Sequence, residues 1–154
     1  MDKGKKFAFV LIVLVFVASG CQQRFQDTKT EKKKLEAMIH ELFEVIDRHD
    51  YQTLRDICTE DFVLFEAGKM MNIDQTIEFL RPFKGKGEAT RTFENIQVYV
   101  DGTAAWIHLN HKAVRSGDGH ERSINWFESA GLRKVEDVWK FALYHNSVIG
   151  LNEQ

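Results

Sequence analysis

Three side chains in the second half of the sequence could take part in proton transfer or ligand binding. His111, Glu128 and His145 stand in strand-like stretches (LNHKAV, WFESA and LYHNS), where burial can tune the strength of an acid or base. Ser147 follows two residues after His145, a spacing of ~6.5 Å along a strand. A direct Ser–His hydrogen bond cannot span that distance, and no third member of a triad is evident. The sequence therefore argues against a serine hydrolase.

His108 and His111 could also be interpreted as a metal-binding pair. Residues three apart on a strand face opposite sides of the sheet, so the two cannot share an ion. A helix would bring them together, but residues 104–114 alternate as a strand does. We predict no metal site and no cofactor.

Alternation along the last strand, predicted over residues 137–149, decides which of its side chains face the interior. The more apolar face, which we expect to be concave, carries Trp139, Phe141, Leu143, His145 and Ser147. The opposite face carries Lys140, Ala142, Tyr144 and Asn146. This assignment places His145 and Ser147 inside the molecule.

The same alternation assigns the inward side chains of the two preceding strands. Over residues 104–115 the inward set is Ala105, Ile107, Leu109, His111 and Ala113, and over residues 121–130 it is Arg122, Ile124, Trp126 and Glu128. Candidate ligand-binding residues are therefore His111, Arg122, Trp126, Trp139, His145 and Ser147, with His145 or Glu128 as a candidate base. The alternatives are that the histidines and tryptophans only fill the core, and that Arg122 and Glu128 lie at a solvated strand end.

These strands follow a helical first half. Apolar residues recur at spacings of three and four over residues 32–49 and predict a long amphipathic helix. Asp50 and Asp74 are expected to cap shorter helices over residues 51–58 and 75–81, with a short strand over residues 60–65 between them. Hairpin turns are predicted at residues 101–102 and 116–119, and a looser turn at 133–136. This order predicts an α+β fold.

The N-terminus predicts export from the cytoplasm. Three lysines precede an apolar run over residues 7–18, which is the pattern of a secretory signal and too short for a comfortable membrane span. The ending Ala18-Ser19-Gly20-Cys21 resembles a bacterial lipobox, although Ala18 stands where Leu, Val or Ile is usual. That resemblance implies a signal peptide over residues 1–20, lipid on Cys21, a tether over residues 21–31 and a domain over residues 32–150. The alternatives are an ordinary signal peptide and an uncleaved anchor.

The protein would then work at the cell envelope, on the extracytoplasmic side of a membrane, at the outer membrane if the host is Gram-negative. The full chain has a net charge of −2, and losing three lysines and one aspartate with the signal makes it more negative. Such a chain lacks the basic excess that nucleic-acid binding needs. Cys58 would remain as a single thiol, and we expect it to be a small buried side chain.

The C-terminal half resembles the nuclear transport factor 2-like superfamily. The ending Trp139…His145-x-Ser147 is similar to that of the calcium/calmodulin-dependent kinase II association domain, and Phe65-Glu66-Ala67-Gly68 and Ala104-Ala105-Trp106-Ile107 fit the same pattern. The resemblance covers residues 32–149. It implies a cone, in which a curved antiparallel sheet wraps around the long helix with a pocket at its open end.

In this superfamily the strands of His111 and His145 flank a shared neighbour, which would place the two histidines ~10 Å apart around one small ligand. Relatives include polyketide cyclases, isomerases, dehydratases and binding or assembly domains, so the fold alone does not give the function. The sequence favours a membrane-anchored small-ligand-binding or assembly domain. The alternative is a pocket enzyme of the isomerase, cyclase or dehydratase type with a His or Glu base. Aromatic side chains predicted on the outer face (Tyr99, Trp106, His108 and Tyr144) favour a homodimer.

Overall fold

The computed structural model describes residues 29–84, 89–117 and 120–153. The predicted signal peptide and Cys21 lie outside these residues. Within the described part of the chain, no helix is both long enough and apolar enough to cross a membrane.

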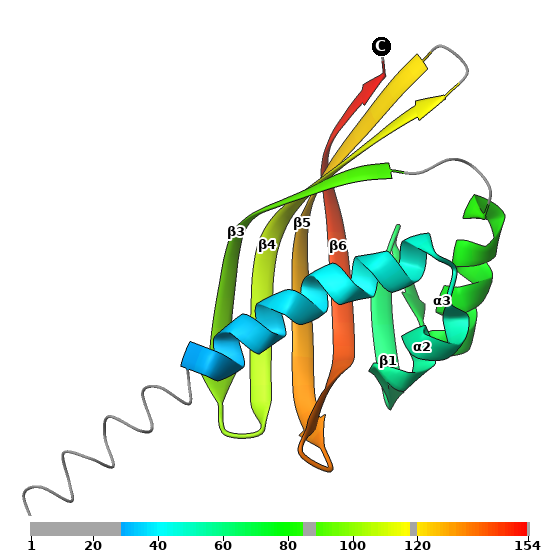
Figure 1. Ribbon diagram of the computed structural model, residues 1–154. Coiled ribbons are helices and arrows are strands. Elements are labelled where there is room, and N and C mark those ends of the chain that lie inside the picture. The colour runs from blue at the N-terminus through cyan, green and yellow to red at the C-terminus, as the bar shows by residue number, and fades with distance from the viewer. Residues whose placement is uncertain (1–28, 85–88, 118–119, 154) are drawn as a thin grey trace, which may run out of the picture.

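A long helix over residues 29–47 opens the described chain and lies across one face of the sheet (Figure 1). Its buried residues recur at helical spacing and form one face: Leu35, Met38, Ile39, Leu42, Phe43 and Val45. The helix starts earlier than expected, since it already includes residues 29–31 of the predicted tether. Glu31 accepts a hydrogen bond from the Trp139 indole and lies 3.4 Å from the Lys134 ammonium. Residues 29–31 are therefore helical, and Glu31 contacts the sheet.

Two short helices follow and sit at the β1 end of the sheet (Figure 1). Helix α2 (Tyr51–Asp56) begins after Asp50, whose carboxylate accepts hydrogen bonds from the Thr53 amide and hydroxyl, as a capping residue should. Helix α3 (Ile73–Leu80) is capped by Asn72 and not by Asp74, because Asn72 and Gln75 form a reciprocal capping box. A single 3-10 turn, η1 (Arg81–Phe83), ends this region at the chain's one proline.

Six strands form one open sheet in the order β2-β1-β6-β5-β4-β3. Their bounds are Cys58–Glu66 (β1), Lys69–Met71 (β2), Ala89–Asp101 (β3), Ala104–Gly117 (β4), His120–Val135 (β5) and Val138–Glu153 (β6). The predicted α+β class, with a curved sheet around the long helix, is confirmed. The expectation of a wholly antiparallel sheet is wrong, because β1 pairs with β6 in parallel. The turn between β5 and β6 is tight, with both Glu136 and Asp137 at positive φ, and not the looser turn that was predicted.

A β-bulge in β6 changes which residues of that strand face the helix. Leu132 on β5 pairs with Phe141, but the preceding Gly131 pairs with Leu143, so Ala142 has no partner on β5. One extra residue reverses the alternation beyond it. Trp139 and Phe141 before the bulge are buried, and Tyr144 rather than Leu143 is buried after it.

Candidate functional site

The concave side of the sheet encloses a cavity of about 520 Å³. Its walls come from the long helix, β1, α3 and strands β3 to β6. Most of its lining is apolar, including Leu42, Phe43, Phe62, Leu64, Phe79 and Trp126. Cavities of a few hundred Å³ with apolar walls and a few polar groups are typical of small-molecule sites.

Three acceptor-bearing side chains form a lateral row on the wall of this cavity, and we call them the acceptor row: Glu66, Asn146 and Glu128. Asn146 on β6 pairs with Glu128 on β5, and the adjacent pair Phe65–His145 sets Glu66 of β1 beside Asn146. The Asn146 amide donates a hydrogen bond to the Glu66 carboxylate. The Asn146 carbonyl oxygen is buried and has no hydrogen-bond partner among the described residues.

Glu128 is held by a buried hydrogen-bond network. Its Oε2 accepts a hydrogen bond from the Tyr144 hydroxyl at 2.7 Å, and its Oε1 lies 2.8 Å from Nδ1 of His111. The other imidazole nitrogen, Nε2, lies 3.3 Å from the Arg91 guanidinium. Because a guanidinium can only donate, Nε2 must be the acceptor, which leaves Nδ1 to carry the proton and donate to Glu128. His111 is therefore a neutral bridge between Arg91 and Glu128.

Arg91 closes the other end of this network. Its Nε and Nη2 donate to the two carboxylate oxygens of Asp47 at 2.8 and 2.7 Å, a bidentate pair that fixes the guanidinium. The guanidinium carbon also lies 4.9 Å from the Phe43 ring centroid. Asp47 thus neutralises the arginine that lines this part of the cavity.

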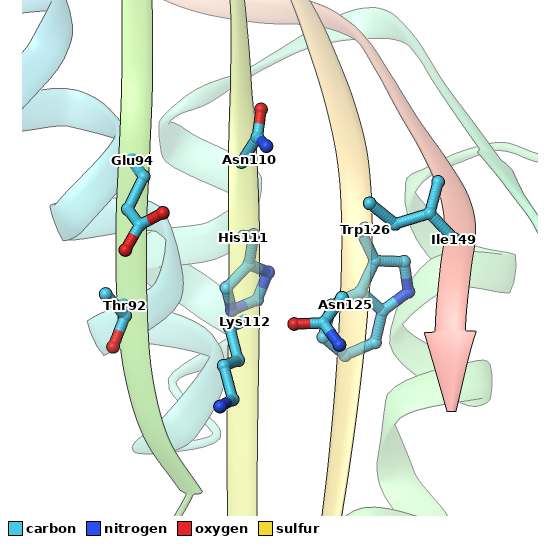
Figure 2. Close-up of a pocket in the computed structure, with 8 residues that line it drawn as sticks. All are labelled: Thr92, Glu94, Asn110, His111, Lys112, Asn125, Trp126 and Ile149. Carbon is cyan, nitrogen blue, oxygen red and sulfur yellow. The ribbon is translucent and has the colours of Figure 1, made fainter. Parts of the chain in front are cut away.

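The imidazole of His111 is packed between aromatic rings. Its ring centroid lies 4.8 Å from that of Trp126 and 4.9 Å from that of Phe93. His111 is 2% exposed and does not line the large cavity. It borders a smaller pocket of about 150 Å³ that also includes Thr92, Glu94, Asn110, Lys112, Asn125, Trp126 and Ile149 (Figure 2). With both ring nitrogens used internally, His111 is placed to orient its neighbours.

Burial changes the acidity of two groups in the cavity. It raises the pKa of Glu66 above its ordinary value, and the nearby Glu128 carboxylate adds to this effect, although the hydrogen bond from Asn146 opposes it. It also raises the pKa of Tyr144 far above its usual range, again with the Glu128 charge acting in the same direction. The Tyr144 hydroxyl therefore stays protonated and remains a donor. Glu66 therefore takes up a proton more readily than a solvated glutamate does.

The expectation that His145 and Ser147 face inward with Trp139 is wrong. Both are exposed on the convex face, since the bulge at Ala142 reverses the alternation, and the His145 ring lies 6.1 Å from that of Phe65. For the same reason Tyr144 and Asn146, expected on the outer face, line the cavity. His111 and His145 consequently point to opposite sides of the sheet and cannot hold one ligand between them.

The remaining predicted residues divide between the cavity and the core. Arg122, Trp126 and Glu128 line the cavity, and Arg122 is exposed. Trp139 lies in the core at 2% exposure and does not line it. A ligand-binding role for the three lining residues stays a prediction.

Sequence reasoning missed several residues of the site: Asp47, Glu66, Arg91, Tyr144 and Asn146. Arg91 was hidden because simple alternation places it on the same face as Tyr99, and only the register shift between Glu94 and Gln97 turns it toward the cavity. Glu66 stood within the stretch that carried the family resemblance, but its neighbours gave no sign that it would meet Asn146. Within residues 29–84, 89–117 and 120–153, no group of three or more His, Cys, Asp or Glu side chains could hold a metal ion.

Comparisons with known proteins agree with this fold. Among solved structures, the chain is similar to the association domain of CaMKII from C. elegans, with 21% identity, a TM-score of 0.69, and coverage of 77% of this chain and 96% of that one. It is similar to a putative scytalone dehydratase from Novosphingobium aromaticivorans, with 15% identity, a TM-score of 0.69, and coverage of 80% and 87%. It is also similar to a type 2 hexachlorocyclohexane dehydrochlorinase, with 12% identity, a TM-score of 0.65, and coverage of 80% and 90%.

At these identities the solved structures show the fold alone. No curated protein sequence matches the chain significantly. The family model for the SnoaL-like domain matches residues 35–150, which include most of the long helix, strands β1 to β5, most of β6 and every residue of the acceptor row. The chain therefore belongs to the SnoaL-like domain family.

Proposed function

We propose that this SnoaL-like domain binds a small, largely apolar ligand in the concave cavity. The observation that carries the proposal is the cavity itself: about 520 Å³ of space, walled by apolar side chains and bordered on one wall by the acceptor row. Apolar walls supply affinity by removing ligand surface from water, and a few polar groups set orientation.

The hydrogen bonds of the buried network favour ligand binding over catalysis by Glu128 or His111. Both oxygens of Glu128 already accept hydrogen bonds, and both nitrogens of His111 are engaged. A general base must turn a lone pair toward the proton that it removes, and these hydrogen bonds hold both side chains in one orientation. Glu128 and His111 instead form a fixed polar wall.

Binding can be tested with N-phenyl-1-naphthylamine, a neutral dye whose fluorescence rises in apolar surroundings. The wild-type protein should bind the dye saturably. Ala113→Trp should abolish binding, because Ala113 lines the cavity and a tryptophan there fills it. The matched control is Ala104→Trp, on the same strand but exposed and outside the cavity lining. Equal dye binding by the two variants would refute the proposed site.

A second candidate function is proton transfer on a bound ligand, as the names of the similar dehydratase and dehydrochlorinase suggest. The observation that favours it is Glu66, which lines the cavity with its pKa raised by burial. A test is exchange of the α-protons of benzylacetone for deuterium, followed by NMR. Exchange that Glu66→Gln abolishes would support this candidate, whereas equal rates with both proteins would remove it.

We further propose that the convex face of the sheet pairs with a second copy of the chain. Tyr99 and Trp106 stack there at 5.2 Å and are 40% and 50% exposed, and Phe127 is 54% exposed. Exposed aromatics grouped on a sheet are typical of an interface. Sedimentation analysis should show a dimer that Trp106→Glu converts to a monomer. A monomeric wild-type protein at high micromolar concentration would contradict this proposal.

The proposed place of action is the extracytoplasmic side of a membrane, with the domain held by lipid on Cys21. The support is the sequence pattern of residues 3–21. In its bacterial host the protein should fractionate with membranes, and Cys21→Ala should release it. Unchanged fractionation of the variant would rule out lipid anchoring.

A further inference from the structure

The polar wall of the cavity contains more hydrogen-bond acceptors than donors. Across the acceptor row, the Asn146 amide donates a hydrogen bond to Glu66, while Tyr144 and His111 each donate one to Glu128. The Asn146 carbonyl oxygen receives nothing, and Glu66 forms no ion pair with a lysine or arginine among the described residues. A buried acceptor that lacks a donor costs free energy, and a ligand that brings a donor removes that cost.

The charges around the row also favour a positive ligand group. Two carboxylates, Glu66 and Glu128, border this part of the cavity, and they interact unfavourably with one another. The arginine closest to them, Arg91, is already neutralised by Asp47. Aromatic rings line the same cavity at Phe62, Phe79 and Trp126, and ring faces attract cations.

The geometry points to a ligand with a protonated amine on an apolar body, whose ammonium group lies between Glu66, the Asn146 carbonyl oxygen and Glu128. This inference rests on the proposed function, because it names the class of ligand for the same cavity. An ammonium group has three donors, which matches the three acceptors of the row. A carboxylate ligand would instead meet two like charges at this wall.

Positive charge lies at the opposite end of the cavity. Arg115 and Arg122 pair across β4 and β5 and both line it. Along β5, Arg122 is ~20 Å from Glu128. A ligand of the size of a phenylpropyl amine therefore meets either the acceptor row or the arginines, and the charge of its head group decides which.

The test uses three compounds that share one apolar body and differ in the head group: 3-phenylpropylamine, 3-phenylpropan-1-ol and 3-phenylpropionate. Each competes with N-phenyl-1-naphthylamine for the full-length protein. The amine should displace the dye at about tenfold lower concentration than the alcohol, which corresponds to one charge-assisted hydrogen bond. The carboxylate should be the weakest competitor.

Two variants locate the effect. Glu66→Gln should remove the advantage of the amine over the alcohol, and it keeps the acceptor for Asn146. Glu60→Gln is the matched control, since Glu60 lies on the same strand, is exposed and does not line the cavity. The melting temperature of each variant is measured first, so that unfolding is not mistaken for a loss of the preference for the amine over the alcohol.

The outcomes separate this inference from the proposed function. Dye binding without amine preference, or a preference that Glu66→Gln leaves unchanged, overturns the inference alone. A preference for the carboxylate also overturns it and assigns recognition to the arginines. Absence of dye binding by the wild-type protein removes the proposed function and the inference with it.

Discussion

Tyr144→Phe removes a single oxygen atom from the buried network and should destabilise the fold measurably. The Tyr144 hydroxyl donates to Glu128 at 2.7 Å, and the two residues are only 4% and 2% exposed. A hydrogen bond to a charged group contributes ~1.5–3 kcal/mol, and water cannot readily replace the lost donor at this depth. With a urea dependence of about 2 kcal/mol per molar, a loss of 2 kcal/mol lowers the unfolding midpoint by about 1 M.

The assay is urea unfolding followed by tryptophan fluorescence. The matched control is Tyr99→Phe, because Tyr99 is exposed on the convex face and its substitution should change the free energy of unfolding by less than ~0.5 kcal/mol. A double-mutant cycle with Glu128→Gln should give a coupling free energy of ~0.5–3 kcal/mol. If Tyr144→Phe is as stable as Tyr99→Phe, the hydroxyl does not hold Glu128, and the interpretation of the network is wrong.

Three further predictions concern stability and reactivity. Asn72→Ala removes the capping box of α3 and should lower the free energy of unfolding by ~0.5–2 kcal/mol, as measured in urea. The folded-state pKa of Glu66 lies above its ordinary value of 4.5, so the folded protein holds this proton more tightly than the unfolded chain. Stability should therefore fall as the pH rises from 4.5 through the folded-state pKa, and thermal melts of Glu66→Gln should lack that component of the decrease. Burial raises the pKa of Cys58 to about 12, so in a Cys21→Ser background the thiol should react with a disulfide reagent only on unfolding; rapid labelling of the folded protein would contradict its burial.

Much of the fold could be predicted because its patterns are local. The stripe of the long helix, the Asp50 cap and the alternation of β4 follow from nearest neighbours in the sequence, whereas a bulge between Glu94 and Gln97 reverses the alternation predicted for β3. The C-terminal ends of β5 and β6 were underestimated, since polar residues such as Arg133 and Asn152 are tolerated in this long hairpin. The parallel pairing of β1 with β6 is non-local, and no residue pattern specified it.

The candidate site depended on one feature that the sequence does not reveal. From Phe141 to Tyr144 four consecutive residues are apolar. The sequence of this run therefore does not show which face of β6 is buried. The bulge at Ala142 resolves this ambiguity in favour of Tyr144, which reaches Glu128, and turns His145 to the outside. Asn146 and Glu66 enter the site only through that change and through the β1–β6 pairing.

The most direct test of the cavity as the binding site is an NMR titration of the three tryptophan indoles with N-phenyl-1-naphthylamine. They stand in three environments: Trp126 lines the cavity, Trp106 is exposed on the convex face, and Trp139 lies in the core. The Trp126 indole N–H resonance should shift progressively with the dye while that of Trp106 stays in place. A shift at Trp106 with Trp126 unchanged would place the binding site on the other face of the sheet and refute binding in the cavity.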